Sequence, residues 1–151
     1  MIASLVAITH NEANVLWKRI VADLDLYAAF GRDTDPEVVA GDWWGALQED
    51  GVTVGLVWLT PWIKNDDTVI AIGRALLPEF RYQKHATYHR DTIQNKIKEV
   101  YPNVKTSIGI IYSTNPASLK ATLNRKGTRL VGAVPFGKET MYIFVFNEWN
   151  D

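Results

Sequence analysis

The sequence VIAIGRALLPEFR, residues 69–81, predicts a buried strand that ends in a turn. Pro78 ends the strand, because proline has no N–H group to donate to a neighbouring strand. Apolar residues then recur at helical spacing up to Val100, and the mostly apolar run from Lys105 to Tyr112 predicts a second buried strand. A helix between two such strands implies a crossover connection, which leaves the two strands parallel.

The ends of these elements suggest a site for a phosphate-bearing ligand. A helix that follows the turn presents free N–H groups and a partial positive charge in its first turn, which suits a phosphate. Asn115 then caps the next predicted helix, and Pro116 takes its first position. Only one acid lies between residues 81 and 98, against five basic residues: Arg81, Lys84, Arg90, Lys96 and Lys98.

The rest of the chain supplies the other elements of a mixed sheet. Thr9 and Glu12 have the spacing of a capping box, so a helix is expected from about Asn11 to about Phe30. Asp50-Gly51 is a favoured pair for a tight hairpin turn. A short helical turn is expected at residues 36–41, a helix at 115–127, strands at 2–8, 43–48, 52–59, 69–77 and 105–112, and a closing hairpin from segments 129–134, 136–139 and 141–146.

Length and composition are those of one globular domain over residues 1–151. Apolar residues make up 47% of the chain and aromatic residues 11%, which is enough for a sizeable core. The formal net charge of −1 gives no field that would attract nucleic acid or anionic lipid, so any polyanion site must be a local patch. Arg90, Lys96 and Lys98 therefore predict a solvated helix face rather than a nucleic-acid site.

The sequence excludes several kinds of chemistry. It contains no cysteine, which excludes disulfides, a thiolate nucleophile and cysteine-based zinc sites. No apolar run approaches the roughly 18 residues of a membrane span, and the N-terminus has no signal-peptide pattern, so a cytoplasmic protein is expected. His85 and His89 share a helix face without a third ligand, so we predict partly exposed histidines and no metal site.

Two motifs of the central segment occur together in a known superfamily. The first joins a strand that ends in apolar-x-Pro-acidic-aromatic-Arg to the phrase Arg/Gln-x-x-Gly-x-Gly/Ala, and here Leu76 leads through Arg81 to Ala86. The second is an Asn-x-x-Ala/Ser helix start followed by a glycine, as in Asn115 to Gly127. In these motifs and in the order of its elements, the chain resembles the GNAT superfamily of acetyl-coenzyme A dependent N-acetyltransferases.

This resemblance implies a fold, a reaction and a ligand site. The expected fold is α/β, with a mixed sheet of six to seven strands that is mostly antiparallel, one central parallel pair and about four flanking helices. The expected reaction moves an acetyl group from acetyl-coenzyme A to a primary amine by direct attack, with no catalytic residue assigned. The cofactor-binding residues would be Leu76, Leu77, Arg81, Tyr82, Gln83, Lys84, His85, Ala86, Asn115 and Ser118.

The sequence departs from the superfamily pattern at two places. Lys84 stands where the motif has its central glycine, and Thr122 or Leu123 falls where many members have a general-acid tyrosine. These departures favour an alternative, a non-catalytic GNAT-like structural or assembly protein, loosely similar to small proteins of tailed bacteriophages. Such a protein would lie in the host cytoplasm or the virion and would bind protein partners through Trp43, Trp44, Trp58 and Trp62.

Two side chains near the proposed cleft are further candidates for proton transfer. Glu79 could act as a base if burial raised its pKa, although an acid in such a turn also binds nearby N–H groups. Tyr112, at the end of its strand, could act as an acid, although tyrosines at strand ends also pack against cores. Both alternatives stay open at the level of sequence.

Overall fold

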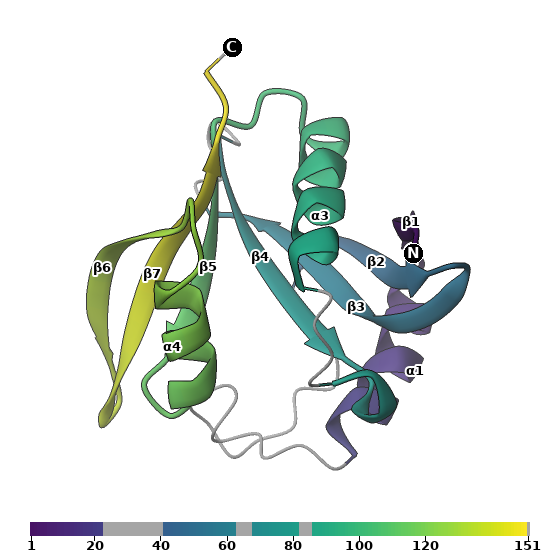
Figure 1. The fold of residues 1–151 in the computed structure, drawn as a ribbon, viewed down its shortest axis with the longest axis horizontal. Coiled ribbons are helices and arrows are strands. Elements are labelled where there is room, and N and C mark those ends of the chain that lie inside the picture. Colours follow the sequence, from purple (N-terminus) through teal and green to yellow (C-terminus); the bar gives the residue numbers. More distant parts are fainter. Residues whose placement is uncertain (23–40, 63–67, 82–85, 151) are drawn as a thin grey trace.

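The protein is built on a seven-stranded sheet with the strand order β1-β2-β3-β4-β5-β7-β6 (Figure 1). The computed structural model describes residues 1–22, 41–62, 68–81 and 86–150, with only the backbone of residues 86–88. The parallel pair is β4 with β5, and the other pairs are antiparallel, which confirms the predicted mixed sheet. The strands are β1 (Ala3–Ala7), β2 (Trp43–Glu49), β3 (Val52–Pro61), β4 (Val69–Leu76), β5 (Thr106–Tyr112), β6 (Arg129–Phe136) and β7 (Glu139–Glu148).

Three α-helices and one 3-10 turn lie within the described ranges. The helices are α1 (His10–Val21), α3 (Ala86–Val100) and α4 (Pro116–Leu123), and the 3-10 turn is η1 (Pro78–Phe80). The extension of the first helix to Phe30 and the helical turn at residues 36–41, which would give the fourth helix expected, lie outside the described residues. None of the described helices has the length and hydropathy needed to cross a bilayer.

Local sequence signals start and end several of these elements as predicted. The Thr9 hydroxyl accepts from the N–H of Glu12, and the Glu12 carboxylate accepts from the N–H of Thr9. These bonds lower the pKa of Glu12, chiefly through the Thr9 backbone N–H, and confirm the capping box. Asp50 and Gly51 both have positive φ angles, of 50° and 83°, as a type I′ hairpin turn requires.

Two helices cover opposite faces of the N-terminal half of the sheet. Ile93 and Ile97 of α3 pack on one face, in a core that includes Leu47, Val57 and Ile70. On the other face α1 packs against the sheet and forms a second core, which we call the α1-side core. Its buried members are Ala13, Leu16, Trp17, Ile20, Val21, Leu56 and Leu77. Because side chains alternate along a strand, the sheet supplies residues to both cores.

The C-terminal half of the sheet carries α4. Pro116 follows its cap Asn115, as predicted, and the helix ends at Leu123, which is earlier than the predicted stop at Gly127. Gly127 instead occupies the turn before β6 with a φ angle of 84°. The closing hairpin is confirmed as one long pair of strands joined at Gly137-Lys138, and β6 includes Pro135, which the predicted segments left out. Pro135 is tolerated because β6 is an edge strand.

Gly73 of β4 provides a test of how tightly the sheet packs beneath α1. A Cβ atom at this position would lie 1.8 Å from Cε2 of Trp58, whose ring also meets Trp17 edge-on at a centroid distance of 5.8 Å. Gly73→Ala should therefore cost about 1–3 kcal/mol of unfolding free energy and lower the thermal midpoint by roughly 2–10 °C. Circular dichroism melting measures this change.

Gly132→Ala is the matched control for that substitution. A Cβ atom added at Gly132 would have Cδ1 of Ile143 as its nearest neighbour, at 3.7 Å, which is an ordinary contact. We expect its midpoint to stay within about 2 °C of the parent protein. An equal effect of both substitutions would contradict the packing of Trp58 on Gly73.

Candidate functional site

The parallel strands β4 and β5 separate part-way along their length. Their pairing runs from Val69 with Thr106 to Ile72 with Gly109 and stops there. Beyond that point β4 stays paired with β3 up to Leu76, and β5 stays paired with β7 up to Tyr112. Figure 1 shows the two strands meeting at one end and diverging toward the other. We call the unpaired edges, residues 73–76 and 110–112, the wedge.

The backbone of β4 has hydrogen-bonding groups directed toward the wedge. The N–H of Leu77 donates to Val54, and the C=O of Val69 accepts from Trp62, so the odd-numbered residues face β3. Because these groups alternate along a strand, Arg74 and Leu76 direct theirs toward β5, where no strand pairs with them in the described part of the chain. An extended ligand with amide groups could pair with this edge.

Arg81 and Leu77 both make contacts that hold the fold together. The guanidinium of Arg81 donates to the C=O of Leu76 at 3.1 Å and to the C=O of Ile20 at 2.6 Å, so it joins the end of β4 to α1. Leu77 is buried in the α1-side core, and its N–H and C=O are bonded to Val54 and Phe80. Both backbone groups of Leu77, one of the predicted cofactor-binding residues, thus have partners within the fold.

The remaining predicted cofactor residues lie around the open end of the wedge or outside the described residues. Asn115, three residues after β5, accepts the N–H of Ser118 at 3.3 Å and thereby caps α4. Both side chains are half-buried. The backbone of Ala86 begins α3. Tyr82, Gln83, Lys84 and His85 lie outside the described residues.

The candidates for proton transfer differ in exposure and packing. Glu79 is exposed and lies 3.8 Å from Arg19, so its carboxylate is not buried. Tyr112 packs against Phe136 with ring centroids 5.0 Å apart. The two positions for a general acid on α4 are the buried Thr122 and the exposed Leu123. These side chains assign no acid or base.

His89 is buried rather than exposed, which corrects the sequence prediction. Its side chain is 4% exposed, its Nδ1 lies 3.2 Å from Nη1 of Arg74, and its Nε2 lies 3.6 Å from a carboxylate oxygen of Glu49. It therefore links Arg74 on β4 to Glu49 on β2. Within the described ranges, no group of three or more metal-ligating side chains could hold an ion.

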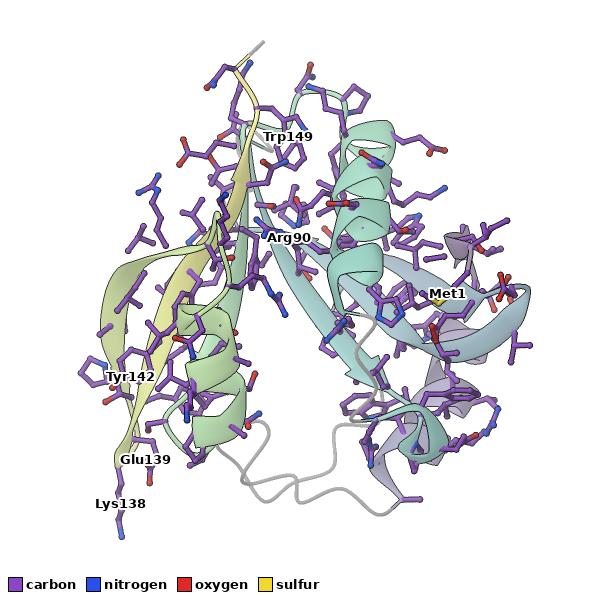
Figure 2. All side chains as sticks on the ribbon, in the orientation of Figure 1. Met1, Arg90, Lys138, Glu139, Tyr142 and Trp149 are labelled. Carbon is purple, nitrogen blue, oxygen red and sulfur yellow. The ribbon has the colours of Figure 1, made fainter. Side chains whose placement is uncertain are left out.

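Arg90 also differs from its prediction as a solvated residue of α3. Its guanidinium donates to the C=O of Lys126 at 2.7 Å and to the C=O of Phe146 at 2.8 Å. Figure 2 shows Arg90 between α3 and the β5–β7 side of the molecule. The other two basic residues of this helix make local contacts, since Lys96 pairs with Glu99 and Lys98 donates to Pro102.

Three arginines from separate elements gather near the wedge: Arg74, Arg90 and Arg125. We call them the arginine cluster. Desolvation, and then the charge of Arg125, lower the pKa of Arg74 to about 10. Desolvation, and then the charge of Arg90, lower the pKa of Arg125. The side chain of Arg74 is nevertheless exposed to solvent. One sequence feature could have indicated this cluster: Arg74 is the one charged residue within an otherwise apolar strand.

The four tryptophans named for the protein-binding alternative do not all lie on one exposed surface. Trp43 packs against the α3-side core, whereas Trp44 and Trp58 pack against the α1-side core. Trp62 is the exposed member, at 46%. Adjacent residues of a strand point to opposite faces, so Trp43 and Trp44 cannot face one partner together.

Several solved structures that match this fold are acetyltransferases. The aminoglycoside acetyltransferase AAC(6')-Ib with paromomycin and acetyl-CoA matches with a TM-score of 0.72 and 14% identity, over 96% of this chain and 93% of that one. A GNAT-family acetyltransferase from Bacillus anthracis gives 0.66 and 14%, over 96% and 94%. The protein yncA from Salmonella typhimurium, with its cofactor acetyl-CoA, gives 0.62 and 14%, over 100% and 98%.

The chain has the GNAT fold. This confirms the fold expected from the two sequence motifs. Neither a protein-family model nor a curated protein sequence matches the chain. At these identities the likeness establishes the fold, and the loose resemblance to phage proteins stays a prediction.

Arg81→Met tests the structural role of Arg81. The substitution removes two charge-assisted hydrogen bonds, to Leu76 and Ile20, so unfolding free energy should fall by about 1–3 kcal/mol in the absence of any ligand. Urea unfolding monitored by fluorescence measures the loss. Arg129→Met is the control, because Arg129 forms an exposed ion pair with Glu148. Equal stability of the two variants would show that the bonds of Arg81 do not matter to the fold.

Proposed function

We propose that the protein is a GNAT-type N-acyltransferase that moves an acyl group from an acyl-coenzyme A to a primary amine. The observation that carries this proposal is the end of β4–β5 pairing at Ile72 and Gly109 while both strands continue. The separation leaves a free backbone edge next to the start of α3. The structural neighbours solved with acetyl-CoA or coenzyme A support the same ligand for this chain.

The free edge of β4 suits a pantetheine arm, which carries two amide groups. The N–H and C=O of Arg74 and the N–H of Leu76 are directed toward the wedge, whereas the C=O of Leu76 accepts from Arg81. Arg81 thus holds the last residue of strand β4 in place. The first turn of α3, which follows residues 82–85, supplies free N–H groups that suit the pyrophosphate.

The reaction needs an activated acyl group and a positioned amine. Acetyl-coenzyme A would supply a thioester, and the amine nitrogen would form a bond to its carbonyl carbon while the C–S bond breaks. The nitrogen loses one proton in this step, and the sulfur of coenzyme A receives one. Backbone N–H groups of β4 would donate to the carbonyl oxygen, where negative charge develops. The wedge would hold the two reactants at attack distance.

Isothermal titration with acetyl-CoA tests the proposal directly. We expect a dissociation constant of roughly 1 μM to 1 mM, the range of typical enzyme substrates, and competition by coenzyme A. Desulfo-coenzyme A should bind similarly, because the wedge and α3 contact the arm and the phosphates. The absence of heat at millimolar acetyl-CoA would remove the enzyme proposal and leave the non-catalytic alternative.

Lys84→Gly tests how the departure from the superfamily motif acts. If the side chain narrows the approach of the phosphates to the backbone, its removal should tighten acetyl-CoA binding several-fold. If Lys84 instead pairs with a phosphate, the same change should weaken binding, by about fivefold or more at low salt. Lys84→Ala separates the loss of charge from the gain of backbone freedom, because it removes the amine without adding glycine.

A further inference from the structure

The side chain of Arg74 joins the unpaired part of β4 to the start of α3. Arg74 is two residues beyond Ile72, where β4 and β5 last pair. Its Nη1 lies 3.2 Å from Nδ1 of His89, which belongs to the first turn of α3. Arg74 is exposed, whereas His89 is buried. The guanidinium therefore lies where the open edge of β4 and the beginning of α3 meet solvent.

His89 fixes the direction of this guanidinium. A guanidinium has only donors, so Nδ1 of His89 accepts and Nε2 carries the ring proton. That N–H faces Glu49 of β2, whose carboxylate oxygen lies 3.6 Å from Nε2 and whose side chain is 11% exposed. Glu49, His89 and Arg74 thus form a row of polar groups that leads from β2 to the wedge.

The start of α3 is also held from the other side of the wedge. Arg90, the residue after His89, donates to the C=O of Lys126 at 2.7 Å and to the C=O of Phe146 at 2.8 Å. These bonds link α3 to the turn before β6 and to β7. The first turn of α3 therefore has a fixed position between the two halves of the sheet.

Arg74 lies beside N–H groups that α3 leaves free. The first four N–H groups of a helix have no partner within the helix. Helical side chains tilt toward the N-terminus, so the imidazole of His89 and the guanidinium bonded to it lie alongside these groups. A guanidinium has five donors, and Arg74 forms no bond to a carboxylate among the described residues. Most of its donors remain for a ligand.

We propose that Arg74 binds the pyrophosphate of the acyl-coenzyme A through its guanidinium, and that His89 and Glu49 position it. This inference rests on the proposed function, which places the phosphates at the start of α3. The side chain of Arg74 leaves the strand at right angles to the edge that its backbone offers to the pantetheine arm, so the two contacts do not compete. A planar guanidinium matches the spacing of two phosphate oxygens.

This assignment accounts for the main departure from the superfamily motif. The central glycine of that motif lets the backbone come close to the phosphates, and Lys84 stands in its place. A side chain that reaches the phosphates from β4 does not depend on that close approach. Arg74 would thus supply donors that a chain with the glycine obtains from its backbone.

Titration of acetyl-CoA into Arg74 variants at two salt concentrations tests the assignment. At low salt, Arg74→Met should weaken binding by about tenfold or more, because a charge-assisted hydrogen bond is lost. Arg74→Lys should weaken it by no more than about threefold, since the positive charge is kept. At about 0.5 M sodium chloride, the difference between Arg74→Met and the parent protein should shrink to about threefold, because salt screens the pair.

A second ligand and two further variants serve as controls. 3′-Dephospho-coenzyme A keeps the pyrophosphate and lacks the 3′-phosphate, so Arg74→Met should weaken it as much as it weakens coenzyme A. Arg74→Gln removes the charge and can still donate to His89, so a folding defect of Arg74→Met does not decide the result. Arg129→Met removes an exposed arginine that pairs with Glu148, and its affinities should stay within about twofold of the parent protein. Thermal melting checks that each variant is folded.

A double-mutant cycle tests the positioning role of His89. His89→Leu removes the acceptor for Arg74, whereas His89→Asn keeps an amide oxygen close to the place of Nδ1. We expect His89→Leu to weaken acetyl-CoA binding about fivefold in the parent protein and less than about twofold in the Arg74→Met background. His89→Asn should stay within about twofold of the parent protein. Equal weakening by His89→Leu in both backgrounds would show that His89 does not act through Arg74.

The other outcomes decide against the inference. If acetyl-CoA binds Arg74→Met as tightly as the parent protein, the assignment fails and the proposed acyltransferase stands. A loss of equal size at low and high salt places Arg74 against a neutral part of the ligand or in the fold alone. A loss with coenzyme A but not with 3′-dephospho-coenzyme A assigns Arg74 to the 3′-phosphate instead. If acetyl-CoA does not bind the parent protein, the proposed function fails, and the inference fails with it.

Discussion

The structure depends on the point at which β4 and β5 stop pairing, which we call the fork. Each strand is held on its outer side, β4 by β3 as far as Leu76 and β5 by β7 as far as Tyr112. The two inner strands do not pair with each other beyond Ile72 and Gly109, and an unpaired edge in the middle of a sheet leaves backbone hydrogen bonds unmade. Such an edge is expected to be retained where a ligand completes it.

Two glycines next to the fork let aromatic rings pack tightly against the strands. The ring of Trp58 lies on Gly73, and the ring of Phe146 lies on Gly109. Gly73 lies on the same face of β4 as Ala75, which packs against the α1-side core. Gly109 lies on the same face of β5 as Ser107, whose hydroxyl donates a hydrogen bond to Gln94 of α3. The fork is thus packed from both faces of the sheet. Arg90 adds a connection across the α3 side through its bonds to Phe146 and Lys126.

Charge at the fork opposes the general balance of the chain. The net charge is −1, yet three arginines gather where the strands meet, and desolvation lowers the pKa of two of them. A protein selected for stability alone would gain by replacing such groups. These arginines lie beside the free backbone edge of β4, so their positive charge belongs to the candidate site rather than to the core. The net charge is summed over the whole chain, so it does not reveal a local cluster of arginines.

The sequence by itself determined the elements and their order, because local interactions encode them. Thr9 with Glu12, Asp50 with Gly51, Pro78, and Asn115 with Pro116 each satisfy or remove backbone groups within a few residues. The parallel β4–β5 pair followed from a helix between two buried strands. Only the tertiary structure decided which side chains gather at the site. Arg74, Arg90 and Arg125 come together from three elements, and Arg81 bonds to α1 instead. A long guanidinium side chain can reach solvent or a distant C=O group from the same backbone position, so its partner depends on packing that no local pattern encodes.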